Sequence, residues 1–163
     1  MVASYSEFKG KVALVTGVGQ AKAHNIELWG NGAATARHLA LNGAIVIGSD
    51  LNAKDAEWTK QRILTECPDA RIDLFVANMT NLEEVKKMVA EIVRVHGRID
   101  YLVNNVGVSS PGGPVELAAE VSWNGITECL VIQVTDLANK RDLVAVGLHS
   151  SARCQPYLRL SVL

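Results

Sequence analysis

The chain has 163 residues, which suits one domain, and a chain of this size buries roughly 70% of its unfolded surface. Its 16 Lys and Arg nearly balance 17 Asp and Glu, and this near-neutral charge argues against nucleic-acid and anionic-membrane partners. Short apolar runs, a polar stretch over residues 1–11 and three scattered cysteines predict a cytoplasmic protein with reduced thiols and no membrane span.

The first predicted elements are a strand, a glycine-rich stretch and a helix. The apolar run Val12–Val15 predicts a short strand, and strong helix formers over Ala33–Leu41 predict the helix. Asn42 and Gly43 suit the end of that helix. A second apolar strand over Ala44–Gly48 then leads to Asp50.

The next elements continue the alternation of helices and strands. A helix over Ala53–Glu66 has Asn52 as its expected N-cap, and a strand over Arg71–Ala77 follows. Apolar residues at helical spacing predict a helix from Leu82 to Gly97, followed by a strand over Ile99–Val103. Apolar strands joined by amphipathic helices predict an α/β fold with a parallel sheet that is covered on both faces.

The glycines after the first strand are the most informative residues. Gly17, Gly30 and Gly32 follow this strand and precede the first helix, and Asp50 lies at the end of the second strand. A strand, a glycine turn, a helix and then an acidic residue is the arrangement of dinucleotide-binding sites. Glycines let the backbone N–H groups and the helix N-terminus approach a pyrophosphate. An ordinary turn is the alternative for glycines in this position.

Residues 21–29 interrupt this turn. Without them the segment reads T-G-V-G-Q-G-N-G, which resembles the short-chain dehydrogenase/reductase (SDR) family, whose turn is T-G-x-x-x-G-x-G. Nine extra residues cost only about 1 kcal/mol in loop-closure entropy. The stricter requirement is geometric, because both glycine clusters must meet at one pyrophosphate.

The resemblance covers Gly10 to about Trp123 and implies a Rossmann-type, doubly wound parallel sheet over residues 1–127. The strand-end segment from Asn104 to Gly107 is similar to the family's Asn-Asn-Ala-Gly. Asp50 would bind the adenosine ribose and favour NAD over NADP, because its carboxylate repels a 2′-phosphate; a strand-end Asx turn is the alternative. Asn78 would accept from adenine, or cap the following helix. The cofactor-binding residues that the resemblance implies are Gly17, Gly30, Asn31, Gly32, Asp50, Leu51, Asn78, Met79, Asn104, Val106 and Gly107.

Beyond Trp123 the family pattern ends. The family's catalytic serine and Tyr-x-x-x-Lys are missing, because the residue four positions after Tyr157 is Ser161. Ser150 and Ser151 precede this tyrosine by about half the family's separation, so no catalytic residue is assigned. No histidine stands at a metal-ligand spacing, so no metal site is expected.

The segment 128–163 is therefore a divergent tail, from natural divergence, alternative splicing or a wrong reading frame. A sheet truncated after about its fourth strand would expose Ile99–Val103 as an edge. Either Leu130–Val134 or Leu143–Leu148 is expected to pair there as a substitute strand. Homo-oligomerisation through the exposed edge is the other way to cover it.

Three functions are compatible with the sequence. The first is an NAD-dependent oxidoreductase that transfers hydride between NAD and an alcohol or ketone. The second is a cofactor-binding module, or a defective relative, that binds NAD without turnover. The third is a chain whose interrupted turn binds nothing and which persists through association.

Overall fold

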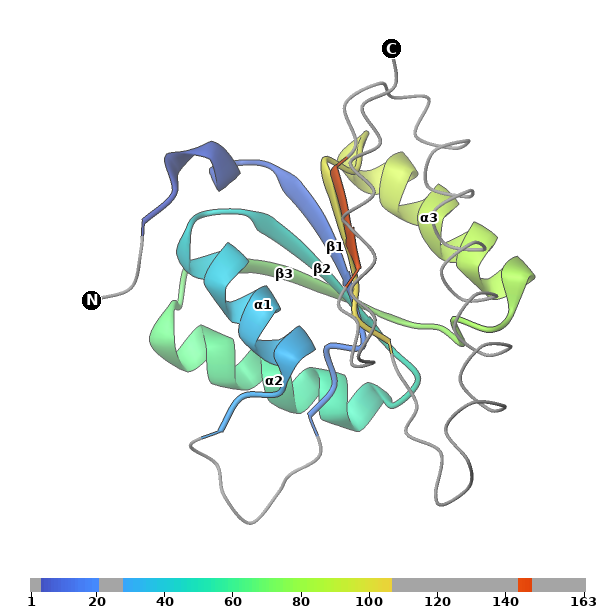
Figure 1. The fold of residues 1–163 in the computed structure, drawn as a ribbon, viewed down its shortest axis with the longest axis horizontal. Helices are drawn as coiled ribbons and strands as arrows, with labels where there is room; N and C mark the ends of the chain where they lie inside the picture. The colour runs from blue at the N-terminus through green and yellow to red at the C-terminus, as the bar shows by residue number, and fades with distance from the viewer. Residues whose placement is uncertain (1–3, 21–27, 107–143, 148–163) are drawn as a thin grey trace.

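The computed structural model describes residues 4–20, 28–106 and 144–147. Hydrophobic strands alternate with amphipathic helices, and helices cover both faces of the sheet (Figure 1). The strands β1, β2 and β4 are largely buried, whereas β3 at the edge is buried only in part. The elements are the 3-10 helix η1 (Ser6–Phe8), β1 (Val12–Thr16), α1 (Asn31–Leu41), β2 (Ile45–Asp50), α2 (Ala53–Glu66), β3 (Arg71–Val76), α3 (Leu82–His96), β4 (Tyr101–Asn104) and β5 (Val144–Gly147).

The strands form one parallel sheet in the order β3-β2-β1-β4-β5. The central strand β1 pairs with β2 on one side and β4 on the other, so that Leu14 lies opposite both Ile47 and Leu102. The chain winds outward from β1 to β3 and then returns to place β4 on the other side of β1. The prediction of a Rossmann-type, doubly wound sheet is confirmed, and its switch point lies between the carboxyl ends of β1 and β4.

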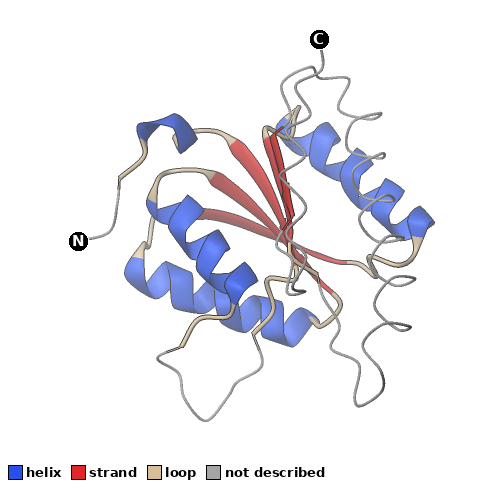
Figure 2. Cartoon of the chain, viewed as in Figure 1, coloured by secondary structure: helices blue, strands red, loops and turns tan. Residues whose placement is uncertain are grey.

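Two hydrophobic cores lie on opposite faces of this sheet (Figure 2). On one face Leu14 packs with Met88 and Ile92 of α3. On the other face the neighbouring residue Val15 packs with Leu39 of α1 and Ile63 of α2. Alternate residues of β1 therefore serve opposite cores, because successive strand side chains point to opposite faces.

The helix ends follow from local capping. The side chain of Asn52 accepts from the backbone N–H groups of Lys54 and Asp55 and begins α2, as predicted. Gly97 ends α3 in the left-handed conformation, with φ of 74°. The N-cap of α3 is Asn81, so the alternative role of Asn78 as that cap is wrong.

Several element bounds differ from the sequence prediction. Helix α1 begins at Asn31, so Asn31 and Gly32 lie in its first turn instead of in the loop. Strand β2 continues to Asp50, because its ladders with β1 and β3 run through Ser49 and Asp50. Strand β4 starts at Tyr101. The preceding residue, Asp100, contacts Val12 of β1 twice: its carboxylate accepts from the Val12 N–H at 2.8 Å, and its own N–H donates to the Val12 carbonyl at 2.8 Å.

Strand β5 pairs in parallel with β4 and covers its outer edge. Leu102 lies opposite Ala145, and the two strands run side by side in Figure 1, β4 in yellow and β5 in orange-red. Strand β5 falls within the stretch Leu143–Leu148, which the sequence offers as one substitute strand. The other candidate, Leu130–Val134, lies outside the described residues.

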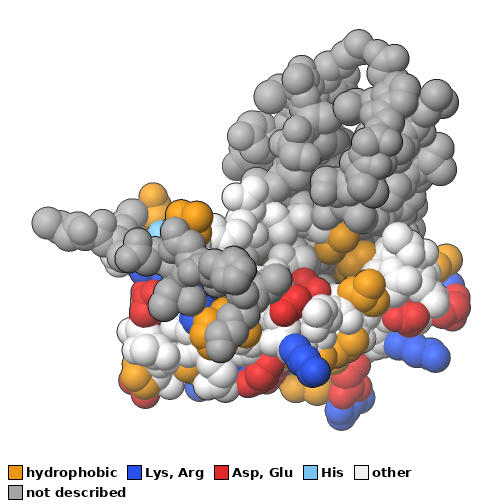
Figure 3. All heavy atoms as spheres, turned by 90° about the horizontal axis from the view of Figure 1, so that it is seen from below, with side chains coloured by type: hydrophobic (Ala, Val, Ile, Leu, Met, Phe, Trp, Pro, Cys, Tyr) orange, Lys and Arg blue, Asp and Glu red, His pale blue; other side chains and the backbone are white. Residues whose placement is uncertain are grey.

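The surface of the described region carries both charges. Figure 3 shows Lys and Arg interspersed with Asp and Glu over the described part of one face. Within residues 4–20, 28–106 and 144–147, no helix has the length and apolarity needed to cross a membrane. The same residues hold no group of three His, Cys, Asp or Glu side chains that could bind a metal ion.

Candidate functional site

The turn after β1 is fixed to the end of β2 by backbone hydrogen bonds. Gly17 has φ of 68°, a left-handed conformation that favours glycine. Its N–H donates to the Ser49 carbonyl at 2.7 Å, and the N–H of Val18 donates to the same oxygen at 3.2 Å. The turn therefore leaves the sheet at its carboxyl edge, where ligands bind in open α/β sheets.

The two glycine clusters meet despite the interruption between them. A Cβ atom added to Gly32 would lie 2.1 Å from the Gly17 carbonyl oxygen and 2.5 Å from Asn105 Nδ2. Asn105 Nδ2 itself donates to the Gly17 carbonyl at 3.0 Å. The first turn of α1 thus lies directly against the turn after β1, an approach that only a glycine at position 32 allows.

The N-terminus of α1 is open to a ligand at Gly30. Gly30 is the N-cap residue with an extended backbone, and a Cβ added there would meet nothing within 4 Å. Since glycine has no side chain to cap the helix, it offers no partner to the N–H groups of the first turn. Asn31 is exposed beside it. A helix N-terminus of this kind stabilises an anionic group through its N–H donors and its dipole.

Asp50 binds the backbone on both sides of the strand end. Its Oδ2 accepts from the Gly19 N–H at 2.7 Å, and its Oδ1 accepts from the Asn52 N–H at 2.9 Å. The second contact is the Asx turn that the sequence offers as an alternative. A carboxylate has about four acceptor positions, so these two bonds leave room for ligand hydroxyls. Leu51 is exposed beside it.

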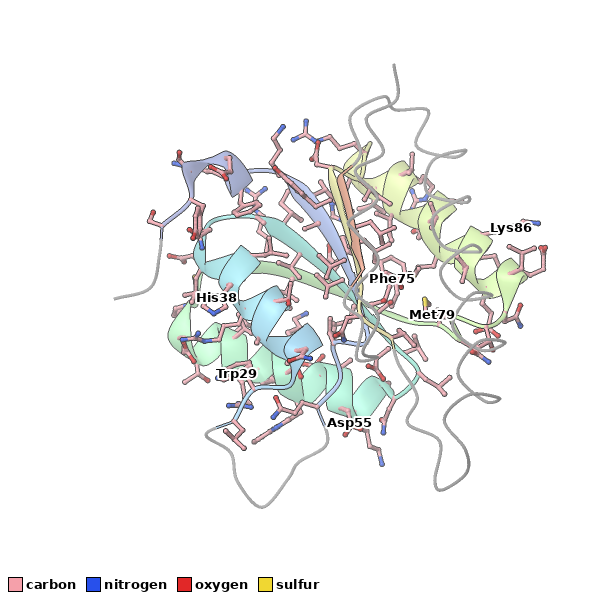
Figure 4. The ribbon with its side chains drawn as sticks, in the orientation of Figure 1. Trp29, His38, Asp55, Phe75, Met79 and Lys86 are labelled. Carbon is pink, nitrogen blue, oxygen red and sulfur yellow. The ribbon has the colours of Figure 1, made fainter. Side chains whose placement is uncertain are left out.

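Asn78 and Met79 follow β3 and differ in accessibility. The Asn78 amide oxygen accepts from the Thr80 N–H at 3.0 Å and from the Thr80 hydroxyl at 2.8 Å. The Met79 side chain is buried in the core beneath α3, and Figure 4 shows it on the α3 side of the sheet with Phe75. A ligand would therefore meet the backbone of Met79 and not its thioether.

The hydroxyl of Thr16, the last residue of β1, bonds to the residues at the end of β4. Thr16 Oγ1 donates to Asn104 Oδ1 at 3.3 Å and accepts from the N–H groups of Asn105 at 3.1 Å and Val106 at 3.3 Å. Asn104 Nδ2 is buried without a hydrogen-bond partner among the described residues. Gly107, also predicted to bind the cofactor, lies outside the described residues. The Thr16 hydroxyl thus holds β1 and β4 together at the switch point.

Comparison with known proteins identifies the family. Residues 11–139 match the sequence profile of the family described as short chain dehydrogenase. The chain belongs to the short-chain dehydrogenase family. The matched residues include the turn after β1 and the ends of β2, β3 and β4, where the candidate site lies.

Individual members of the short-chain dehydrogenase family are identical to this chain at about a third of the aligned positions. A 3-oxoacyl-(acyl-carrier-protein) reductase of Thermotoga maritima is 30% identical over 118 residues, covering 72% of this chain and 43% of the relative. Levodione reductase of Leifsonia aquatica is 32% identical over 111 residues, covering 68% of this chain and 38% of the relative. The chain therefore spans less than half the length of these relatives.

Solved structures agree with this fold. The crystal structure of a levodione reductase superposes with a TM-score of 0.71 and 26% identity, covering 86% of this chain and 54% of that one. An NAD+-bound xylitol dehydrogenase has a TM-score of 0.69 and 26% identity, covering 86% of this chain and 53% of that one.

Three residues of this candidate site are missing from the sequence prediction. They are Thr16, Gly19 and Asn105, which join the glycine turn to β4 and to Asp50. Each stands inside a motif that the sequence does display, the T-G-V-G-Q turn or the Asn-Asn pair. The signal was therefore present, but spacing does not reveal which motif residues bind one another and which face a ligand.

Proposed function

We propose that this chain forms the cofactor-binding part of an NAD(P)-dependent oxidoreductase that interconverts an alcohol and a ketone. The observation that carries the proposal is the contact between Gly17 and Gly32, where an added Cβ would lie 2.1 Å from the Gly17 oxygen. It means that the turn after β1 and the first turn of α1 lie against each other, although nine residues interrupt the sequence between them. The bound nicotinamide would supply the hydride chemistry, and the chain would supply the binding.

The residues divide by the part of the cofactor they would hold. The open N-terminus of α1, at Gly30, Asn31 and Gly32, would receive the pyrophosphate, and Gly17 would line the turn beside it. Among the described residues, the buried and unpartnered Nδ2 of Asn104 is a donor suited to the nicotinamide-side ribose, next to Val106. Gly107 is proposed for the same ribose.

The adenosine half would lie over the ends of β2 and β3. Asp50 would accept from the adenosine ribose with its remaining oxygen positions, beside the exposed Leu51. Asn78 and the Met79 backbone would border the adenine. The Asn78 oxygen already accepts two local hydrogen bonds, which favours a contact through its nitrogen instead.

NAD is the proposed cofactor, since the Asp50 carboxylate would repel a 2′-phosphate. This preference rests on Asp50 alone, because one solved structure of this fold holds NAD+ and another holds NADP. The substrate is proposed only as an alcohol or ketone.

A second candidate function is cofactor binding without catalysis. It is favoured by one observation in the sequence: the only tyrosine after Tyr101 is Tyr157, and Ser161 stands where the family's lysine would follow. Binding would then serve as a nucleotide sensor or support a partner chain.

Calorimetric titration with NADH and NADPH, followed by turnover assays on a panel of alcohols with NAD, tests both candidates. Saturable NADH binding with tenfold or weaker NADPH binding supports the site, at about 1.4 kcal/mol per tenfold difference. Turnover then selects the oxidoreductase, and its absence selects the binding module. If neither cofactor binds, both candidates fail.

A further inference from the structure

The two ends of the interruption in the glycine turn are in direct contact. The Gln20 side-chain nitrogen donates to the Leu28 carbonyl oxygen at 2.7 Å. The Gln20 backbone N–H donates to the Asp55 carbonyl at 3.3 Å, at the start of α2. The chain therefore leaves the turn at Gln20 and re-enters beside the same point at Leu28, two residues before Gly30.

One side chain from α2 holds both ends. Arg62 Nη1 donates to Gln20 Oε1 at 3.0 Å and to the Leu28 carbonyl at 3.1 Å. Its guanidinium carbon lies 3.8 Å from the centre of the Trp29 ring, within the range of a cation–π contact. Figure 4 shows Trp29 beside α1 and α2, on the face of the sheet opposite Met79. Arg62 thus contacts the last residue before the interruption and two residues at its end.

We propose that Arg62 is a positioning residue that closes the interrupted turn, so that Gly30 and Gly32 return to Gly17 despite the added residues. This inference rests on the proposed function, because the turn it closes is the proposed pyrophosphate site. Arginine suits the role, since its planar guanidinium can stack on an aromatic ring while its N–H groups bind oxygens in the same plane. Lysine has no planar group and would keep only part of these contacts.

Arg37 provides a matched control on the same ring. Its guanidinium carbon lies 5.4 Å from the Trp29 ring centre, and its Nε donates to Glu66 Oε2 at 2.8 Å. These contacts support the packing of α1 on α2 but join neither Gln20 nor Leu28. Arg37→Met therefore removes a cation and a ring contact of the same kind and leaves the turn closed.

The test is a double-mutant cycle between Arg62→Met and deletion of residues 21–29. In the full chain, Arg62→Met opens the turn, and the apparent dissociation constant for NADH rises roughly tenfold as the binding-competent fraction falls. In the deleted chain Gln20 joins Gly30 directly, so the same substitution changes NADH affinity by less than about twofold. Arg37→Met leaves NADH affinity within about twofold in the full chain.

Amide hydrogen exchange of Gly17–Gln20 without cofactor is the second readout, and it keeps this proposal separate from the proposed function. Faster exchange of this segment in Arg62→Met, but not in Arg37→Met, supports the closure even if no chain binds NADH, in which case only the proposed function fails. Arg62→Lys should give intermediate exchange. Equal NADH losses in both backgrounds, or unchanged exchange in Arg62→Met, would overturn the proposal. If the deleted chain does not fold, the exchange comparison decides alone.

Discussion

Replacing Gly32 by alanine should disrupt the turn, because the added methyl group has no room. It would lie 2.1 Å from the Gly17 oxygen, 2.5 Å from Asn105 Nδ2 and 2.9 Å from the Gly17 carbonyl carbon. Two of these neighbours are backbone atoms, which cannot move aside as the end of a flexible side chain can. Overpacking of this kind costs about 1–3 kcal/mol, and we expect the upper end of that range for Gly32→Ala.

Gly30→Ala is the matched control for stability. A Cβ at Gly30 meets nothing within 4 Å, and its φ of −64° is open to any residue. Alanine is a poorer N-cap than glycine, by up to about 1 kcal/mol, but it also restricts the unfolded chain by about 0.4–1 kcal/mol. These two effects nearly cancel, so the folded state should keep its stability. The new methyl group would instead occupy space that the pyrophosphate needs.

Urea unfolding and NADH titration of the two variants separate these effects. Gly32→Ala should lower the free energy of unfolding by about 3 kcal/mol and abolish binding. Gly30→Ala should unfold like the parent chain but bind NADH roughly tenfold more weakly. If Gly32→Ala is as stable as Gly30→Ala, the methyl group at position 32 has room after all. If Gly30→Ala binds NADH as the parent chain does, the pyrophosphate does not lie at Gly30.

Substitutions at Asp50, Thr16 and Arg37 test three other contacts. Asp50→Asn should lower the preference for NADH over NADPH roughly tenfold in titrations; an unchanged ratio would exclude Asp50 from the ribose site. Thr16→Val should lower the free energy of unfolding by about 2–3 kcal/mol, because it leaves the N–H groups of Asn105 and Val106 without their acceptor. Thr16→Ser keeps the hydroxyl and should retain most of the parent chain's stability in the same urea unfolding measurement. Arg37 holds the Glu66 pKa below 4.5 mainly through their hydrogen bond, so this pair stabilises the fold above that pH and the contribution is lost as pH falls through the lowered pKa. The difference in stability between the parent chain and Arg37→Met should therefore shrink in acid, and a difference that grows would contradict the pairing.

The order of helices and strands could be predicted because their signals are local. Apolar periodicity marked α3, and Asn52 and Gly97 marked helix ends. The extension of β2 to Asp50 was not visible, because pairing with β1 and β3 carries the strand through polar residues. Sheet pairing is a tertiary effect that local propensity does not contain.

The candidate site was predictable in type but not in its internal contacts. Motif spacing pointed to Gly17, Gly32 and Asp50, yet it could not show that the two glycine clusters touch. That contact depends on how Gln20 and Leu28 are held by Arg62, whose position seven residues along α2 from Asp55 carries no motif signal. Such long-range hydrogen bonds are set by the packing of α2 on the sheet.

The most direct test of this account is energy transfer from tryptophan to NADH in the full chain. Trp29 packs beside the start of α1, so bound NADH should quench its emission and gain sensitised fluorescence, and Trp29→Phe should remove part of that signal. We expect a saturable signal at micromolar NADH that ADP-ribose reverses by competition. No transfer up to millimolar NADH would contradict it and would mean that the interrupted turn does not bind the cofactor.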